Sequence, residues 1–109
     1  MARRLSRGEI WGYRFGAPDK WRPVLILTRQ QVIGLLHTVM VAPITSTIHG
    51  APSEVTVGID EGLKRDSAVN LDHVQTVEQS RLVRFIGRVP PGKMQRICHA
   101  LAVAVACDV

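Results

Sequence analysis

Short hydrophobic stretches separated by turn-forming residues make up most of the chain. Residues 9–15 are rich in aromatics and end at a turn signal at 16–20, which predicts a first strand. Residues 23–27 form a continuous apolar run, as expected for a strand buried on both faces. Residues 37–42 predict a third strand, which follows the weakly patterned stretch 29–36.

The second half of the chain predicts shorter strands. Residues 54–58 alternate between apolar and polar types, which predicts a half-exposed strand after a turn-rich loop at 48–53. A charged connection at 60–66 comes next. Three more short strands are predicted at 67–71, 74–77 and 83–87.

The pattern becomes helical after the turn at 90–92. Pro91 suits the first turn of a helix, where a missing N–H is tolerated. An apolar stripe follows at helical spacing, formed by Met94, Ile97, Cys98, Leu101 and Val105. Six or seven short strands and one terminal helix indicate a mainly β fold, a small and strongly bent β-barrel with the helix packed against it.

Length and composition indicate one soluble domain spanning 1–109. The chain has 109 residues, of which 46% are hydrophobic and 21% charged. No apolar run approaches the roughly 20 residues that a membrane helix needs. The basic start of the chain leads into Gly-Glu-Ile-Trp rather than an apolar segment, so we expect no secretory signal and a cytoplasmic protein.

The charge balance favours a polyanionic partner. Lys and Arg outnumber Asp and Glu by 14 to 9, giving a net charge of +5. Nucleic acid is the commonest such partner, although a merely soluble basic surface has the same composition. Seven cations fall in the first 29 residues and predict a cationic N-terminal face: Arg3, Arg4, Arg7, Arg14, Lys20, Arg22 and Arg29.

The two cysteines and four histidines predict neither a disulfide nor a metal site. On a helix, Cys98 and Cys107 lie about 13 Å apart, too far for a disulfide. No set of Cys and His residues has zinc-ligand spacing. We therefore expect reduced thiols, no metal and no cofactor.

Polar groups gather at one end of two predicted strands. Arg22 precedes the apolar run at 23–27, and Thr45, Ser46 and Thr47 close the run at 41–47. If these ends meet, a guanidinium fork and several hydroxyls converge on one place. Such a group suits a phosphodiester, whose oxygens match the fork and accept hydrogen bonds from hydroxyls.

Five blocks in order resemble the MazF/PemK family, the endoribonuclease toxins of toxin–antitoxin pairs. They are Arg-Gly-Glu-Ile-Trp at 7–11, Arg-Pro-Val-Leu-Ile-Leu at 22–27, Val-Ala-Pro-Ile-Thr at 41–45, Asp-Ser-Ala-Val-Asn at 66–70, and Ile-Gly at 86–87 before the terminal helix. The resemblance implies an SH3-like barrel (MazF/CcdB-like), a homodimer, and metal-independent cleavage of single-stranded RNA. It also implies inhibition by an antitoxin whose disordered tail lies across the RNA site.

The resemblance also implies roles for individual residues. The family's catalytic arginine matches Arg22 and its catalytic threonine matches Thr45. In the PemK branch an arginine and an aspartate are implicated. The aspartate matches Asp72, whereas Asn70 takes the place of the arginine. The loop at 16–21, which gates the RNA groove in the family, is short here.

RNA-binding residues are expected around this pair. Arg14, Lys20, Ser46 and Asn70 are candidates for holding the RNA, and Trp21 for stacking on a base. Several of the candidate site residues also have a plainer structural interpretation. Arg22 also fits a strand-end charge, and the residues at 45–47 also fit a turn that caps backbone groups. Trp11 is expected in the core.

Asp72 and His73 resemble an acid/base pair at first sight. Neighbouring residues of a strand point to opposite faces, so at most one of them is expected to enter the site, and Asp72 is favoured.

Two other functions remain open from the sequence. One is a gyrase poison of the CcdB type, although this chain ends in Ala-Cys-Asp-Val rather than that branch's Trp-Gly-Ile. The other is a non-catalytic nucleic-acid-binding barrel, for which the basic charge suffices. Only the ribonuclease is expected to cleave RNA.

Overall fold

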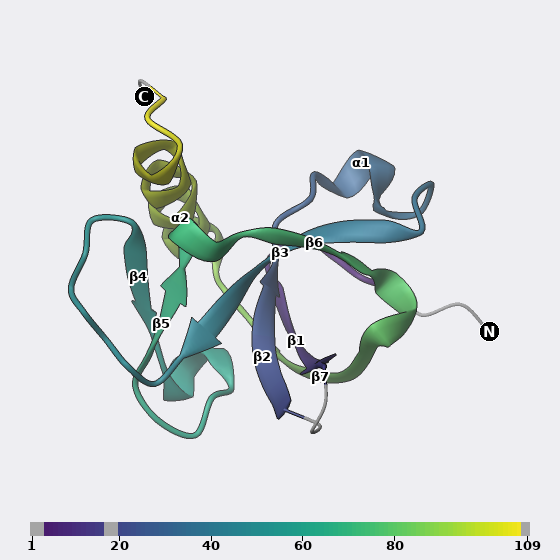
Figure 1. The fold of residues 1–109 in the computed structure, drawn as a ribbon, viewed down its shortest axis with the longest axis horizontal. Coiled ribbons are helices and arrows are strands. Elements are labelled where there is room, and N and C mark those ends of the chain that lie inside the picture. Colours follow the sequence, from purple (N-terminus) through teal and green to yellow (C-terminus); the bar gives the residue numbers. More distant parts are fainter. Residues whose placement is uncertain (1–3, 17–19, 108–109) are drawn as a thin grey trace.

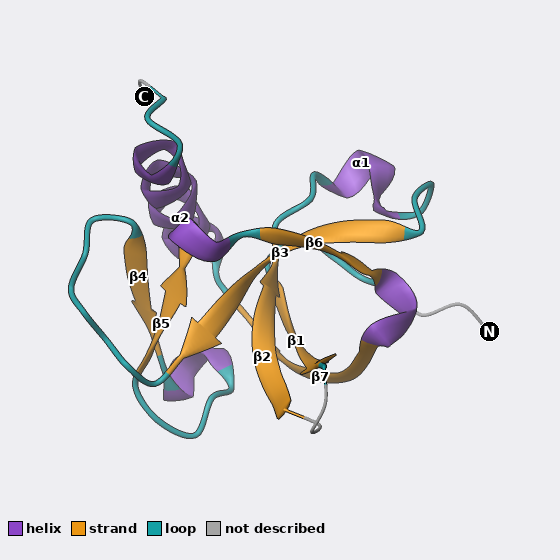
Figure 2. Cartoon of the chain, in the orientation of Figure 1, coloured by secondary structure: helices purple, strands orange, loops and turns teal. Residues whose placement is uncertain are grey.

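The structure, a computed structural model, describes residues 4–16 and 20–107 and places seven strands among them (Figure 1). The strands are β1 (Glu9–Phe15), β2 (Lys20–Ile26), β3 (Thr38–Thr45), β4 (Glu54–Val57), β5 (Ser67–Asn70), β6 (Gln75–Glu78) and β7 (Leu82–Arg88). The helices are α1 (Gln30–Ile33) and α2 (Pro91–Ala104). Three short 3-10 helices, η1 (Ile59–Glu61), η2 (Leu71–His73) and η3 (Gln79–Arg81), lie in the connections (Figure 2).

The strands form one antiparallel sheet in the order β4-β5-β3-β2-β1-β7, with β6 also paired to β3. One edge of β3 pairs with β2, while its other edge pairs first with β6 and then with β5. The sheet therefore curves around β3. This confirms the predicted mainly β class with a C-terminal helix, although the strands follow an open path that ends at β4 and β7 rather than a closed ring.

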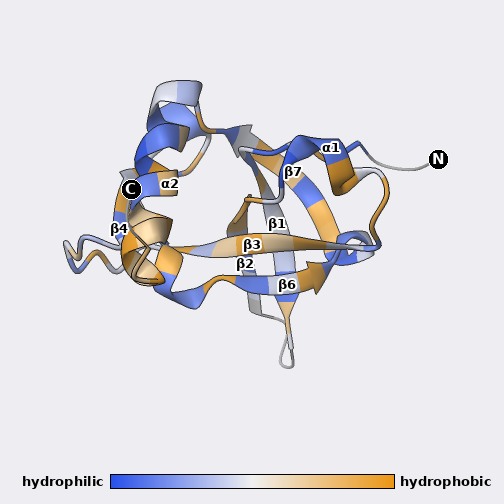
Figure 3. Ribbon diagram, turned by 90° about the horizontal axis from the view of Figure 1, so that it is seen from above, coloured by the Kyte–Doolittle hydropathy of each residue, from blue (hydrophilic) through white to orange (hydrophobic). Residues whose placement is uncertain are grey.

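Side chains of the central strands alternate between two cores. Leu25 and Leu27 of the β2 segment pack with residues of α2 and β4, whereas Val24 and Ile26 pack with residues of β6 and β7. All four are buried, which confirms that this apolar run is covered on both faces. In Figure 3, β3 is likewise coloured mainly as hydrophobic.

Helix α2 stands beside β4 and β5, and α1 lies at the opposite side of the molecule (Figure 1). Pro91 occupies the first turn of α2, as predicted. The predicted stripe is wrong in part, because Cys98 and Val105 are exposed. The buried side instead centres on Ile97 and the small Ala100, with Met94, Leu101 and Ala104 packed around them.

Several borders differ from the sequence expectation. The third strand continues to Thr45, three residues beyond the predicted 37–42, and the stretch 29–36 holds the single-turn helix α1. The continuation to Thr45 agrees with the apolar run at 41–47, which is closed by Thr45, Ser46 and Thr47. Both cysteines are free, as expected.

No helix among the described residues is long and apolar enough to span a membrane.

Candidate active site

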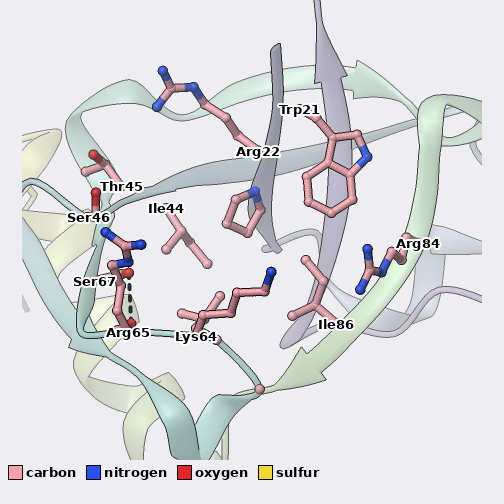
Figure 4. A pocket seen from close by; sticks show the side chains of 13 residues that line it. Trp21, Arg22, Ile44, Thr45, Ser46, Lys64, Arg65, Ser67, Arg84 and Ile86 are labelled. Atoms are coloured by element: carbon pink, nitrogen blue, oxygen red, sulfur yellow. Dashed lines mark hydrogen bonds between the residues drawn. The ribbon is translucent and has the colours of Figure 1, made fainter. Parts of the chain in front are cut away.

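A cavity of about 320 Å³ opens where β2 begins and β3 ends, between these strands, β7 and the turn that follows η1. Figure 4 shows Arg22, Thr45, Ser46 and Arg65 along one side, Trp21, Ile86 and Arg84 along the other, and Lys64 between them. The remaining lining residues are Pro23, Ile44, Gly62, Leu63 and Ser67. The cavity therefore combines an apolar floor with cations and hydroxyls at its rim.

The sheet register brings together the two residues singled out from the sequence. β2 and β3 are antiparallel, with Val24 opposite Pro43. The same register continued by two residues along each strand sets Arg22 opposite Thr45. Both line the cavity. The convergence of the two strand ends that was predicted from the apolar runs is therefore present.

Thr45 holds the turn as well as lining the cavity. Its Oγ1 accepts a hydrogen bond of 3.1 Å from the backbone N–H of Thr47. An accepting hydroxyl keeps its own proton, so Thr45 can still donate to an anion in the cavity. Ser46 is exposed on the same rim, and Thr47 acts in the turn through its backbone.

Trp21 forms one end of the cavity. Its side chain is 38% exposed, and its indole lies against the bare backbone of Gly12, where an added Cβ would come within 2.8 Å of the ring. The Arg84 guanidinium lies 5.4 Å from the ring centroid. Trp11, by contrast, is buried and donates its indole N–H to Glu9 at 3.0 Å, as a core residue.

The turn at 62–65 contributes Lys64 and Arg65, which sequence reasoning missed. The charged segment 60–66 was interpreted only as a connection, because nothing in its pattern says which way it folds. Four cations now line the cavity, and no carboxylate does among the lining residues that the structure describes. In the described part of the chain the ion pairs are Arg88–Glu9 and Lys93–Glu61, so none involves these four. Like charges held close together favour an anion between them.

Asp72 and Asn70 lie outside the cavity lining: Asn70 ends β5, and Asp72 lies in the 3-10 turn η2 that follows. Asp72 and His73 belong to η2, so the expectation of opposite strand faces is wrong. The Asn70 side chain accepts from the Asp72 N–H at 2.9 Å and caps this turn. Ser53 donates to the Asp72 carboxylate at 2.5 Å, and the Asn70 Nδ2 and His73 Nδ1 atoms lie 3.3 Å apart. Asn70, Asp72 and His73 all lie outside the cavity lining.

The other predicted cations are dispersed. Arg14 is exposed near the end of β1 and lies outside the cavity lining. Arg7 donates to the Leu27 carbonyl and, at 3.0 Å, to Cys98 of α2. Arg3, residues 17–19 of the 16–21 loop and the side chain of Lys20 lie outside the described residues.

Within the described ranges, no three His, Cys, Asp or Glu side chains are grouped as metal ligands.

Comparison with known proteins gives one consistent result. The sequence model of a family described as a PemK-like, MazF-like toxin of type II toxin–antitoxin systems matches residues 6–105. The chain is 43% identical over 105 residues to the probable endoribonuclease MazF5 of Mycobacterium tuberculosis, covering 94% of each.

Solved structures agree with the sequence comparison. The fold is similar to that of the M. tuberculosis toxin MazF-mt6, with a TM-score of 0.86 and 37% identity over 93% of this chain and 99% of that one. It is also similar to a mycobacterial endoribonuclease solved with its cognate antitoxin, with a TM-score of 0.81 and 24% identity over 99% of each chain.

Proposed function

This chain belongs to the PemK-like, MazF-like toxin family of type II toxin–antitoxin systems, and from that membership we infer that it is an endoribonuclease toxin neutralised by a cognate antitoxin. We propose further that it cleaves single-stranded RNA sequence-specifically and without a metal. The observation that carries this proposal is the cavity in which Arg22, Thr45 and three further cations converge with no acidic lining residue in the described chain.

The proposed reaction uses the RNA itself as nucleophile. The 2′-oxygen attacks the adjacent phosphorus, the bond from phosphorus to the 5′-oxygen breaks, and the proton lost by the 2′-hydroxyl is balanced by one gained by the 5′-oxygen. The products are a 2′,3′-cyclic phosphate and a 5′-hydroxyl. Such an enzyme needs no covalent residue, but it must orient the phosphate and stabilise its growing charge.

Arg22 and Thr45 are proposed to supply that stabilisation. A guanidinium offers two parallel N–H donors to phosphate oxygens and keeps its charge at any working pH. The Thr45 hydroxyl adds a neutral donor whose position is fixed by the bond from the Thr47 N–H. Because Arg22 is a poor acid, we assign it to charge stabilisation and orientation.

The rim of the cavity is proposed to hold the rest of the RNA strand. The exposed indole of Trp21 can stack on a base, and Ser46 can donate to a phosphate or sugar oxygen. Arg14 and Lys20 are proposed to attract the flanking backbone. Asp72 and Asn70 stay as candidates from the PemK resemblance, although the contacts of both are those of a turn.

The antitoxin is proposed to be acidic in its inhibitory segment. A chain of net charge +5, with a cavity whose four cations form no ion pair among the described residues, suits a flexible peptide rich in Asp and Glu. Such a peptide would fold on binding and occupy the RNA site. We also propose a homodimer and a cytoplasmic location, both in keeping with the family.

One experiment separates this function from its alternatives. Purified protein is incubated with structured and unstructured RNA in excess EDTA, and separately with gyrase. Cleavage of the unstructured RNA supports the proposal. Binding without cleavage supports a non-catalytic barrel, and gyrase inhibition alone supports a CcdB-type poison.

A further inference from the structure

We propose that the turn at 62–65 is a preformed phosphate-binding loop, in which Lys64 and Arg65 bind the RNA backbone beside the scissile phosphate, and that Glu61, held by Lys93, positions it. The inference rests on the proposed ribonuclease function and extends it to residues that no sequence signal marked. Both cations are exposed and line the cavity, Arg65 beside Ser46 and Lys64 nearer the middle (Figure 4).

The loop is held at its start by a buried carboxylate. Glu61 is 3% exposed. Its Oε1 accepts from the Gly58 N–H at 2.6 Å, and its Oε2 accepts from the Lys93 ammonium of α2 at 2.9 Å. Burial raises the pKa of Glu61, but the Lys93 and Gly58 hydrogen bonds and the Lys93 charge outweigh this and leave the pKa below its ordinary value. The carboxylate therefore stays ionised and ties the turn to the helix.

Two glycines allow the same turn to pack closely against β7. Gly62 has φ +95°, a conformation that other residues rarely adopt. A Cβ added at Gly87 would lie 2.0 Å from the Glu61 carbonyl oxygen, and one at Gly62 would lie 2.5 Å from the Ile86 carbonyl oxygen. Only bare backbone allows so close an approach.

The far end of the loop is also fixed. The Ser67 hydroxyl, at the start of β5, donates to the Arg65 carbonyl at 3.1 Å (Figure 4). With Glu61 at one end and Ser67 at the other, the segment has little freedom to lose on binding. A fixed backbone lowers the ordering cost of binding an anion, and only the side chains of Lys64 and Arg65 are left to be ordered.

The charges of the loop are available to a ligand. In the described chain no carboxylate forms an ion pair with Lys64 or Arg65. Figure 4 shows Arg65 beside Ser46, on the same side as Arg22 and Thr45, and Lys64 nearer the middle of the cavity. A strand whose scissile phosphate sits at Arg22 and Thr45 would bring neighbouring phosphates to the loop.

The first test measures binding to an uncleavable 2′-O-methyl copy of the RNA substrate across a range of salt concentrations. Lys64→Ala and Arg65→Ala should each weaken binding about tenfold. Each should also lower the slope of log affinity against log salt by about 0.7, the value for one lost phosphate contact on a single strand. Arg96→Ala, which removes an exposed α2 cation outside the cavity, is the matched control and should keep the slope.

Cleavage kinetics distinguish these residues from the catalytic pair. Both loop variants should raise KM with kcat within about threefold of wild type, because backbone contacts bind substrate and transition state alike. Arg22→Ala should lower kcat instead. If the loop variants keep the wild-type salt slope and KM while Arg22→Ala abolishes cleavage, the phosphate-binding role of the loop is wrong and the ribonuclease function stands. If the wild-type protein cleaves no RNA while Lys64→Ala and Arg65→Ala still lower the salt slope, the ribonuclease is rejected and the phosphate-binding loop is kept.

The positioning role of Glu61 can be tested because it predicts a change in RNA affinity opposite to the one that charge alone predicts. Glu61→Gln makes the protein more positive, so charge alone predicts tighter RNA binding. Positioning of the loop by Glu61 instead predicts that Glu61→Gln weakens RNA binding about fivefold to tenfold. In a Lys64→Ala/Arg65→Ala background the same change should cause no further loss of RNA affinity. Asp60→Asn, the same charge change on the exposed neighbour, should bind at least as well as wild type. Lys93→Arg should retain most of the affinity.

Tighter or equal binding by a folded Glu61→Gln protein would remove Glu61 from the proposal. Equal losses in both backgrounds would assign it a purely structural role. If Glu61→Gln does not fold, Lys93→Met is compared with Arg96→Met, which removes the same charge outside the cavity. The positioning role predicts the larger loss of RNA affinity for Lys93→Met, and equal losses would contradict it.

Discussion

Arg22 and Thr45 are proposed to act on one phosphate from opposite strands. Arg22→Ala and Thr45→Ala should therefore each lower the cleavage rate about 10²-fold or more, as expected when one preorganised donor to a transition-state charge is lost. Arg22→Lys should fail to restore the rate, since an ammonium does not reproduce the guanidinium fork. The measurement is single-turnover cleavage of a defined RNA by variants whose thermal unfolding matches wild type.

The double variant tests whether the two residues form a unit. Its rate should be little lower than that of the worse single variant. His73→Ala serves as a control, because this imidazole lies beside Asn70 and outside the cavity, and it should stay within a few-fold of wild type. Near-normal cleavage by both single variants, or abolition by His73→Ala alone, would refute the assignment.

Trp21 is the second residue whose environment makes a definite prediction. Its indole packs against the backbone of Gly12 and remains partly open to the cavity. Trp21→Ala should weaken RNA binding by about 1–3 kcal/mol, the usual contribution of one base stacked on an aromatic ring. Trp21→Phe should recover part of the loss, because it keeps a smaller aromatic face. Equal affinities for wild type, Ala and Phe variants in a titration with labelled RNA would exclude stacking.

At the scale of elements, the turn η1 depends on one ionised carboxylate. Because the pKa of Glu61 is lowered in the folded state, its stabilising effect is present above about pH 4.5 and is lost as pH falls through the folded value. Glu61→Gln should thus cost about 1–3 kcal/mol at neutral pH. The difference in free energy of unfolding between wild type and variant should shrink steadily below pH 4.5. A difference that stays constant from pH 7 to pH 3 would mean that the Glu61 charge does not hold the turn.

The strands that shape the cavity were predictable, and the turn that completes it was not. A continuous apolar run at 23–27 indicates a strand buried on both faces, and Arg22 and Thr45 are recognisable as polar strand ends. Lys64 and Arg65 sit in a charged segment without periodicity. Their direction is set by contacts distant in sequence, from Glu61 to Lys93 and from Gly62 to Gly87. The expectation of opposite strand faces for Asp72 and His73 failed for a similar reason, since both lie in the short turn η2, which the Asn70 side chain caps.

At the scale of the whole molecule, we expect two copies to pair. Several large apolar side chains are exposed, among them Leu35, Leu36 and Met40, and family membership favours a symmetric dimer. Light scattering should give twice the chain mass of 12.0 kDa at working concentration. A mass of 12.0 kDa over the whole concentration range would contradict the dimer.

Charge makes a prediction for the antitoxin. Association of the toxin with an acidic antitoxin segment should be fast at low salt and slow markedly as salt rises, because electrostatic steering is screened. Stopped-flow association at several salt concentrations measures this directly. An on-rate that does not depend on salt, or a basic inhibitory segment, would contradict an electrostatic match between the two proteins.

We propose above all that this cavity cleaves RNA through the substrate's own 2′-hydroxyl. The most direct measurement is to cleave one defined single-stranded RNA in excess EDTA, map the cut by sequencing the new 5′ ends, and repeat the reaction with a single 2′-O-methyl group at the mapped nucleotide. We expect that the unmodified RNA is cleaved in EDTA and that its new ends carry 5′-hydroxyl and 2′,3′-cyclic phosphate groups. The methylated RNA should be completely protected at the same bond. Cleavage of the methylated RNA at the same bond, or new ends carrying a 5′-phosphate, would contradict it.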